Sequence, residues 1–266
     1  SKTININQEF PNILKNFFVK GFLYYDLQVD DKKLTKFNAF DASKNNALIL
    51  KKTKIINIER FREYWKIYLA NNKVITSKII INASGPWVNE VSNDILRIPS
   101  NKSIKLVKGS HIIVNKLYED EVAFTLQNKD KRIIFVIPYK DKYSLIGTTE
   151  VIVKSPNNSQ IDQAEIQYLL NAVNYYLKKQ LKQQDIVDTY SGIRTLVDNF
   201  KEVSKISRDY TFDLNTQNQL SPLLNIYGGK LTTYRKLSER ALNELKDFLP
   251  KNKSKTWTDK TKLKTF

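Results

Sequence analysis

Residues 228–233 read Gly-Gly-Lys-Leu-Thr-Thr and lie between an apolar run and a helical pattern. A glycine pair lets a ligand approach the backbone closely, because neither residue carries a side chain. The first amides of a helix attract an anion or an electron-rich carbonyl group. The segment therefore indicates a place where a flat ring or a phosphate lies against the backbone, although a glycine pair before a helix is also ordinary turn chemistry.

The elements on either side of this turn are a strand and a helix. Residues 223–227 are apolar and predict a buried strand. After the glycines, apolar residues recur at helical spacing up to Pro250, which ends the pattern. Strand, glycine pair and helix together form the unit that we expect to carry a site.

A second helix is predicted over residues 161–181, where one apolar stripe recurs at helical spacing. Asp162 and Glu165 have the spacing of a capping box, and Ile161 with Ile166 has that of a hydrophobic staple. A third helix is predicted over residues 29–40, with Asp30 or Asp31 as its cap.

The remaining patterns predict strands. Residues 55–59, 65–69 and 74–82 are rich in β-branched and aromatic residues, and we expect them to form a meander that turns at Asn71-Asn72 and ends in a buried strand. Further strands are expected over residues 110–114, 132–137 and 143–148.

The composition limits the classes of function. The chain has 266 residues, 41% of them hydrophobic, which is enough for one large or two ordinary domains. The absence of Cys excludes disulfides, thiolate catalysis and Cys-ligated metal centres, and we expect no metal site. No apolar run approaches the roughly 20 residues of a membrane-spanning helix. The sequence begins with Ser1 and contains no Met, and we expect it to be part of a longer protein.

The net charge of +17 is compatible with nucleic acid, an anionic membrane surface or a phosphorylated substrate. Lysines are scattered along the chain, which is also typical of a solvated basic surface. A nucleic-acid-binding module is disfavoured because the sequence shows no aromatic RNA-binding pattern, zinc-finger spacing or basic recognition helix.

Several strings occur in an order that resembles the FAD-dependent, quinone-reducing (aerobic-type) glycerol-3-phosphate dehydrogenases. They are INASGPWV (81–88), LVKGSHIIV (106–114), IPYKDKYSLIGTTE (137–150), YSGIRTLVD (190–198), SRDY (207–210) and LLNIYGGKLTTYRKL (223–237). The resemblance covers residues 21–258, nearly the whole chain.

The resemblance implies an α+β or α/β fold in which an incomplete FAD-binding domain of the glutathione-reductase type is interleaved with a substrate domain built on a mixed or antiparallel sheet. The expected boundaries are 1–29 and 101–194 for the substrate (cap) domain and 30–100 and 195–250 for the partial FAD-binding domain. Residues 251–266 are lysine-rich and are expected to be a linker or tail.

The implied reaction is the oxidation of glycerol 3-phosphate to dihydroxyacetone phosphate, with a hydride passing to FAD and electrons passing on to a quinone. This chemistry needs a base, a phosphate clamp and an oriented ring. The implied location is the cytoplasm, peripheral on the cytoplasmic membrane. A homodimer is left open, and no nucleic-acid partner is expected.

The resemblance assigns the site residue by residue. Arg194, Arg208 and Lys230 match basic positions that face the substrate, and an arginine fork suits phosphate oxygens. His111, the only histidine, is the candidate for the base or for a hydrogen bond to the reacting hydroxyl, and Arg194 is the second catalytic candidate. The ordinary pKa of a histidine, about 6.5, leaves the imidazole of His111 largely neutral at physiological pH. Each assignment competes with a plain structural role, as a surface charge or a satisfied buried histidine.

Five residues are expected to contact the flavin. They are Gly85, Gly228, Gly229, Leu231 and Thr232. Leu231 and Thr232 would offer amides to the carbonyl edge of the ring, whereas Gly85 also suits an ordinary turn.

The chain departs from the family pattern in two ways. Thr195 and Asn199 stand where the family usually has Pro and a second Asp, which puts the local turn in doubt. The sequence also contains no GxGxxG, so it lacks the usual means of holding the FAD pyrophosphate. We therefore expect the isolated chain to be inactive, and a non-catalytic relative acting as a partner or scaffold is the alternative.

Overall fold

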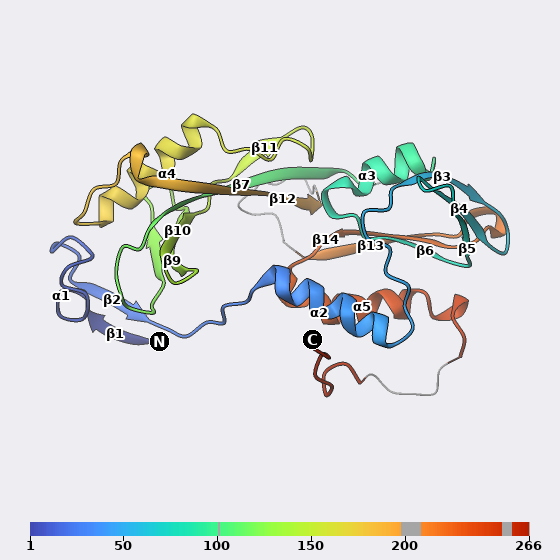
Figure 1. Cartoon of the computed structure of the whole chain (residues 1–266), viewed down its shortest axis with the longest axis horizontal. Helices are drawn as coiled ribbons and strands as arrows, with labels where there is room; N and C mark the ends of the chain where they lie inside the picture. Colours follow the sequence, from blue (N-terminus) through green and yellow to red (C-terminus); the bar gives the residue numbers. More distant parts are fainter. Residues whose placement is uncertain (101, 198–208, 252–256, 266) are drawn as a thin grey trace. The chain divides into compact units, whose positions relative to one another are not determined.

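The structure is a computed structural model that describes residues 1–100, 102–197, 209–251 and 257–265. Its elements follow the chain as labelled in Figure 1. The chain divides into two compact units. Unit 1 comprises Ser1–Leu27 and Leu106–Arg194, and unit 2 comprises Gln28–Lys105 and Thr195–Phe266.

Unit 1 is built on a sheet with one long helix against it. Its elements are β1 (Lys2–Asn5), α1 (Ile6–Glu9), β2 (Lys20–Leu23), β7 (Ile104–Asn115), β8 (Phe124–Gln127), β9 (Ile133–Tyr139), β10 (Tyr143–Gly147), β11 (Val151–Val153), α4 (Gln163–Tyr176), a 3-10 turn η3 (Gln183–Asp185) and β12 (Ile186–Val197). The first residues of β7 and the last residues of β12 fall within unit 2.

The main sheet runs in the order β11-β7-β10-β9-β8, and β12 also pairs with β7. Strands β7 and β10 are antiparallel, with His111 opposite Gly147 and Asn115 opposite Tyr143. Strands β1 and β2 form a separate antiparallel hairpin. The register that places His111 against a glycine determines the geometry of the site described below.

Helix α4 packs on one face of this sheet, as Figure 1 shows. Its buried residues Leu169 and Val173 share a core with Ile112 and Val114 of β7. The helix begins as the sequence predicts: the Asp162 side chain accepts a hydrogen bond from the Glu165 amide, and the Glu165 side chain accepts one from the Asp162 amide. The helix ends at Tyr176, so the predicted end at residue 181 is wrong.

Unit 2 contains two small sheets and two long helices. Its elements are α2 (Asp31–Lys44), β3 (Ile55–Arg60), β4 (Trp65–Leu69), β5 (Val74–Ser77), β6 (Ile80–Asn82), the turns η1 (Gly85–Trp87), α3 (Val88–Glu90) and η2 (Val91–Ile95), then β13 (Tyr210–Asn215), η5 (Gln217–Gln219), β14 (Leu223–Gly228), η6 (Leu231–Thr233), α5 (Tyr234–Glu244) and η7 (Lys246–Phe248).

One sheet of unit 2 is the antiparallel meander β3-β4-β5, with a positive φ of 62° at Asn72, where the sequence predicts a tight turn. The predicted single strand over residues 74–82 is wrong. After β5 the hydroxyl of Ser77 donates to the carbonyl of Ile79, and the next strand, β6, joins a different sheet of order β13-β14-β6. Strands β6 and β14 are parallel there, which gives unit 2 the mixed character of an α/β fold.

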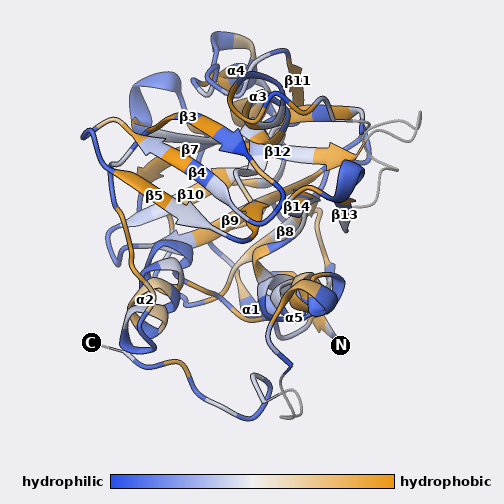
Figure 2. Ribbon diagram, turned by 90° about the vertical axis from the view of Figure 1, so that its right-hand side faces the viewer, coloured by the Kyte–Doolittle hydropathy of each residue, from blue (hydrophilic) through white to orange (hydrophobic). Residues whose placement is uncertain are grey.

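Helix α5 covers this second sheet through Ala241, and Leu245, the residue directly after the helix, shares the same core with Leu224 and Ile226 of β14. The helix ends at Glu244, earlier than the sequence pattern suggests, and η7 continues the turn toward Pro250. Helix α2 is capped by Asp30, as predicted, and has no buried residue. In Figure 2 much of both helices carries the hydrophilic colour, whereas stretches of strand in both units carry the hydrophobic one.

Candidate functional site

The site in unit 1 is centred on His111 and on the glycine opposite it. The imidazole lies directly over Gly147, so closely that a Cβ on that glycine would stand 2.1 Å from the histidine Cδ2. Gly109, two residues earlier on β7, points to the same face because side chains alternate along a strand. Two glycines on this face therefore leave room for large polar side chains against the backbone.

Arg194 of β12 occupies the space over Gly109. A Cβ on Gly109 would stand 3.0 Å from the Arg194 Nη2 and 2.7 Å from the Thr148 hydroxyl. The same guanidinium nitrogen lies 3.6 Å from the Glu150 carboxylate, and both side chains are partly exposed. The guanidinium therefore lies near a carboxylate, at a distance longer than a charge-assisted hydrogen bond.

The electrostatics of this face favour a neutral imidazole. Burial lowers the pKa of His111, the positive charge of Arg194 lowers it further, and a hydrogen bond with the backbone of Tyr190 partly opposes them. The Tyr190 ring lies 5.8 Å from the imidazole, centroid to centroid. The histidine Nδ1 is buried and has no hydrogen-bond partner among the described residues. A ring nitrogen in this state has an unused lone pair that can accept a proton or a hydrogen bond.

The glycine turn of unit 2 follows strand β14. Gly228 and Gly229 have positive φ angles of 72° and 103°, which favour glycine at both positions. A Cβ on Gly228 would stand 2.7 Å from the Asp209 carbonyl, and one on Gly229 would stand 3.0 Å from the Leu237 side chain. The missing side chains of this pair therefore make room for the protein's own backbone and side chains.

The residues after this pair face outward. Lys230, Leu231 and Thr232 are exposed, and the Thr233 hydroxyl accepts from the Lys230 amide and donates to the Lys230 carbonyl. The segment Leu231–Thr233 is a 3-10 turn leading into α5, and the amides that open a helix have no partner within its first turn. Exposed amides beside a lysine suit an electron-rich carbonyl edge, as expected for a flavin.

Gly85 lies on another turn of unit 2, held by buried side chains. The side-chain amide of Asn82 donates to the side-chain oxygen of Asn225 at 2.8 Å and to the backbone carbonyl of Val88 at 3.0 Å. The Ser84 hydroxyl donates to the side-chain oxygen of Asn82 at 2.6 Å. Gly85 has a φ of 60°, and an added Cβ would meet nothing within 4 Å. The space beside this backbone is therefore not filled by the protein's own side chains.

The expected site residues thus lie in separate units. His111 and Arg194 come together in unit 1, whereas Gly85, Gly228, Gly229, Lys230, Leu231 and Thr232 belong to unit 2. Arg208 and Asn199 lie outside the described residues. Thr195, where the family pattern has Pro, lies inside strand β12 and not in a turn.

Sequence reasoning missed several residues of these sites. Glu150 and Tyr190 were part of the strings quoted above, but nothing in their spacing assigned them to Arg194 or His111. The pair Asn82 and Asn225 was also missed, although each is a polar residue inside an apolar run, which is the usual signal of a buried hydrogen bond.

Two other features are absent from the described part of the chain. No group of three or more His, Asp or Glu side chains there is arranged to hold a metal ion. Among those residues, no helix is both long and apolar enough to cross a membrane.

Comparison with known proteins shows the family and the fold of the chain. Residues 3–235 match the family model of the FAD-dependent oxidoreductases. The chain is 42% identical to the aerobic glycerol-3-phosphate dehydrogenase of Escherichia coli over 241 residues, which is 88% of the chain and 48% of that protein. It is 39% identical to the D-erythritol 1-phosphate dehydrogenase of Brucella abortus over 88% of the chain and 48% of that protein.

Among solved structures, the glycerol-3-phosphate dehydrogenase of Bacillus halodurans complexed with FAD superposes with a TM-score of 0.80 at 25% identity, over 96% of this chain and 51% of that one. The chain thus spans about half the length of the relatives it matches. The chain shares the fold of that dehydrogenase and is a member of the FAD-dependent oxidoreductase family.

Proposed function

We propose that this chain is part of a full-length FAD-dependent dehydrogenase that oxidises sn-glycerol 3-phosphate to dihydroxyacetone phosphate. The support is the 42% identity to an aerobic glycerol-3-phosphate dehydrogenase and the fold shared with a second one. The relative named for D-erythritol 1-phosphate also takes a polyol phosphate, so the substrate combines hydroxyl groups with one phosphate.

The observation that carries this proposal is the packing of His111 over Gly147 on the same face of the sheet as Arg194, whose charge, after burial, lowers the pKa of the imidazole. Oxidation of a secondary alcohol removes a proton from the hydroxyl and a hydride from the carbinol carbon. His111 receives the hydroxyl proton on its imidazole. Bound FAD supplies the acceptor for the hydride. The lowered pKa keeps the imidazole in the basic form that this step requires.

Arg194 holds the anionic part of the substrate. Its guanidinium already lies 3.6 Å from the Glu150 carboxylate, a separation longer than a charge-assisted hydrogen bond. A phosphate offers more oxygens and more charge than this single carboxylate, so it is the better partner for the fork. By the family resemblance, Lys230, which is exposed, and Arg208 are the candidates for the further positive charges of the clamp.

The flavin contacts follow from unit 2. Gly85 has open space beside its backbone, and the amides of Leu231 and Thr232, at the start of a helix, would donate to the carbonyl edge of a bound flavin ring. Gly228 and Gly229 shape the turn that presents these amides. The pyrophosphate of FAD requires residues beyond those in this chain, since the sequence contains no GxGxxG.

Three further properties belong to the same proposal. A quinone accepts the electrons, the protein works peripherally on the cytoplasmic membrane, where the net charge of +17 favours an anionic surface, and the isolated chain is inactive. A homodimer is compatible with each of these. The family resemblance supports the quinone, and the missing pyrophosphate motif supports the inactivity.

A dye-linked assay tests the proposal. The full-length protein loaded with FAD should reduce a dye with sn-glycerol 3-phosphate and not with glycerol, because glycerol lacks the phosphate. D-erythritol 1-phosphate in the same assay shows which polyol phosphate is preferred, and the 266-residue chain alone should give no turnover. Equal rates with glycerol, or preference for D-erythritol 1-phosphate, would contradict the proposed substrate.

A further inference from the structure

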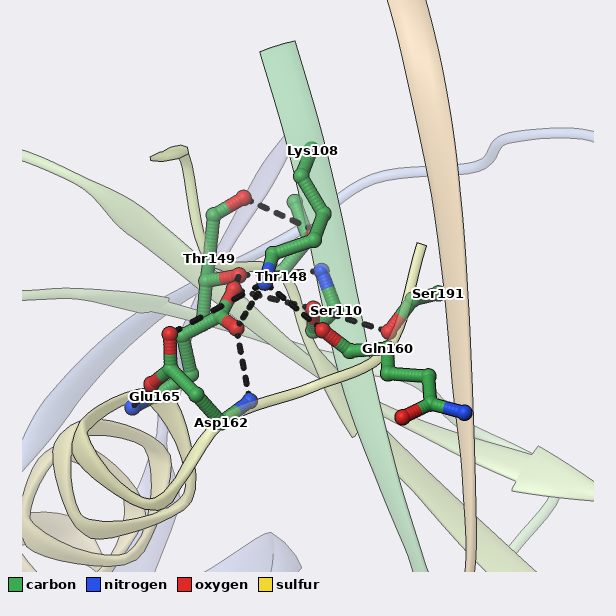
Figure 3. Close-up of polar contacts among 8 residues, drawn as sticks. All are labelled: Lys108, Ser110, Thr148, Thr149, Gln160, Asp162, Glu165 and Ser191. Carbon is green, nitrogen blue, oxygen red and sulfur yellow. Dashed lines mark hydrogen bonds and ion pairs between the residues drawn. The ribbon is translucent and has the colours of Figure 1, made fainter. Parts of the chain in front are cut away.

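On the face of strand β7 opposite His111, unit 1 contains a buried ion pair that the proposed reaction does not use. The Lys108 Nζ lies 2.8 Å from the Glu165 Oε2, and the two side chains are only 4% and 3% exposed. Lys108 also donates to the Gln160 carbonyl at 2.7 Å. Figure 3 shows this pair between strand β7 and the start of helix α4.

The second oxygen of Glu165 extends the pair into a network. It accepts from the Thr149 hydroxyl at 2.6 Å and from the Ser110 hydroxyl at 2.9 Å. The Ser110 amide donates to the Thr149 hydroxyl at 2.9 Å, and the Ser191 hydroxyl of β12 donates to that of Ser110 at 2.9 Å. One carboxylate thus connects helix α4, strands β7 and β12, and the turn after β10 (Figure 3).

Strand alternation places this network on the opposite face from the site. Lys108 and Ser110 point toward α4, as do Ile112 and Val114 in the core. Gly109 and His111, between them in the sequence, face the other side. Each residue that the network holds on β7 is therefore the backbone neighbour of a residue of the site.

The same relation holds on the other two segments. Thr149 lies between Thr148, whose hydroxyl approaches Gly109, and Glu150, which pairs with Arg194. Ser191 follows Tyr190, whose ring lies beside His111. The network therefore holds the backbone of all three segments that supply the site.

Stability alone does not explain a charged pair at this depth. Replacing a buried ion pair with apolar side chains of similar volume is often neutral or stabilising. The neighbouring positions of β7 and α4 already form an apolar core. What the ion pair adds is a set of directional contacts, because an ionised carboxylate with several donors has one favourable orientation.

We propose that Lys108, Glu165 and Thr149 are positioning residues, whose network behind β7 fixes the orientation of the site residues on the opposite face. The inference rests on the proposed function only in taking the His111 face to be the substrate face. The test of the inference measures the surroundings of His111 and does not require catalytic turnover.

The test uses the single histidine of the chain as a probe. In the 266-residue chain, the imidazole gives one set of side-chain NMR signals whose titration reports its surroundings. The groups that act on it are Arg194 and Tyr190, with Glu150 as the ion-pair partner of Arg194. Thr149→Val removes the hydroxyl with little change of volume, whereas Thr149→Ser keeps it.

We expect Thr149→Val to shift the His111 signals and to move the titration midpoint toward its ordinary value of about 6.5, because a site face that is no longer fixed buries the imidazole less and holds Arg194 less closely beside it. Thr149→Ser should restore the original signals and midpoint. Ser144→Ala, which removes another buried hydroxyl of the same sheet, should leave both unchanged. A folded Thr149→Val chain with the original signals would overturn the proposal.

A second variant covers the case in which Thr149→Val does not fold. Ser191→Ala removes only the outermost hydroxyl of the network and leaves the ion pair intact. It should shift the His111 signals in the same direction by a smaller amount, and unchanged signals would likewise overturn the proposal. Failure of the full-length protein to oxidise glycerol 3-phosphate would refute the proposed function and leave this geometric result standing.

Discussion

Replacing Gly147 with alanine puts a methyl carbon where the His111 ring lies. The added Cβ would be 2.1 Å from the imidazole Cδ2, whereas ordinary contact begins at 3.4 Å, so the ring must retreat by 3.4 − 2.1 = 1.3 Å. Forcing extra volume into a packed site costs about 1–3 kcal/mol of the free energy of unfolding. In the full-length protein, a displacement of this size should lower the rate of flavin reduction by about 100-fold.

Gly192→Ala provides the control for the effect on the histidine. Gly192 lies in β12 of the same sheet, and a Cβ there would meet only the Tyr190 hydroxyl, at 3.8 Å. Denaturant unfolding and the NMR signals of His111 should both change in Gly147→Ala and stay nearly constant in Gly192→Ala. If Gly147→Ala left the stability and the His111 signals as they are, the close packing of ring on glycine would be refuted.

Three further predictions concern the stability of unit 1. Below about pH 6.5 the unfolded chain protonates His111 before the folded chain does, so the free energy of unfolding should fall as the pH falls from there through the lowered pKa. The free energy of unfolding of the unsubstituted chain should fall more steeply with falling pH than that of His111→Asn, and the same pH dependence in both would contradict this prediction. Leu169→Ala leaves a cavity at a fully buried position and should lower the free energy of unfolding, measured in urea, by about 2–5 kcal/mol. A loss of less than about 1 kcal/mol would mean that α4 does not pack on the sheet. Asp162→Ala removes the cap of α4 and should lower the free energy of unfolding by about 1 kcal/mol in the same assay. An unchanged free energy of unfolding would contradict the capping box.

Local signals in the sequence predicted the local structure well. The capping box at Asp162 and Glu165, the cap at Asp30 and the positive φ at Asn72 all depend on residues within a few positions of one another. The break inside residues 74–82 was missed because both halves are equally β-rich. Whether a strand continues there depends on its partners, β4 for one half and β14 for the other, and these are distant in the sequence.

The same limit applies to the site. His111 and Arg194 were selected through the family resemblance, and their pairing with Gly147 and Gly109 appears only when the strand register is known. Glu165 was read correctly as a helix cap, but its ion pair with Lys108 joins segments that are far apart in the sequence. The spacing of residues in the sequence therefore could not predict the contacts across the sheet.

The role of Arg194 as the phosphate ligand is the central claim, and single-turnover reduction of the flavin by sn-glycerol 3-phosphate tests it most directly. In the full-length protein, Arg194→Met removes charge-assisted hydrogen bonds worth about 1.5–3 kcal/mol, so the half-saturating substrate concentration should rise by roughly 10- to 100-fold. Arg132→Met, which removes a partly exposed cation that stacks on Tyr168, should leave this concentration unchanged. Equal half-saturating concentrations for Arg194→Met and the unsubstituted protein would contradict the account.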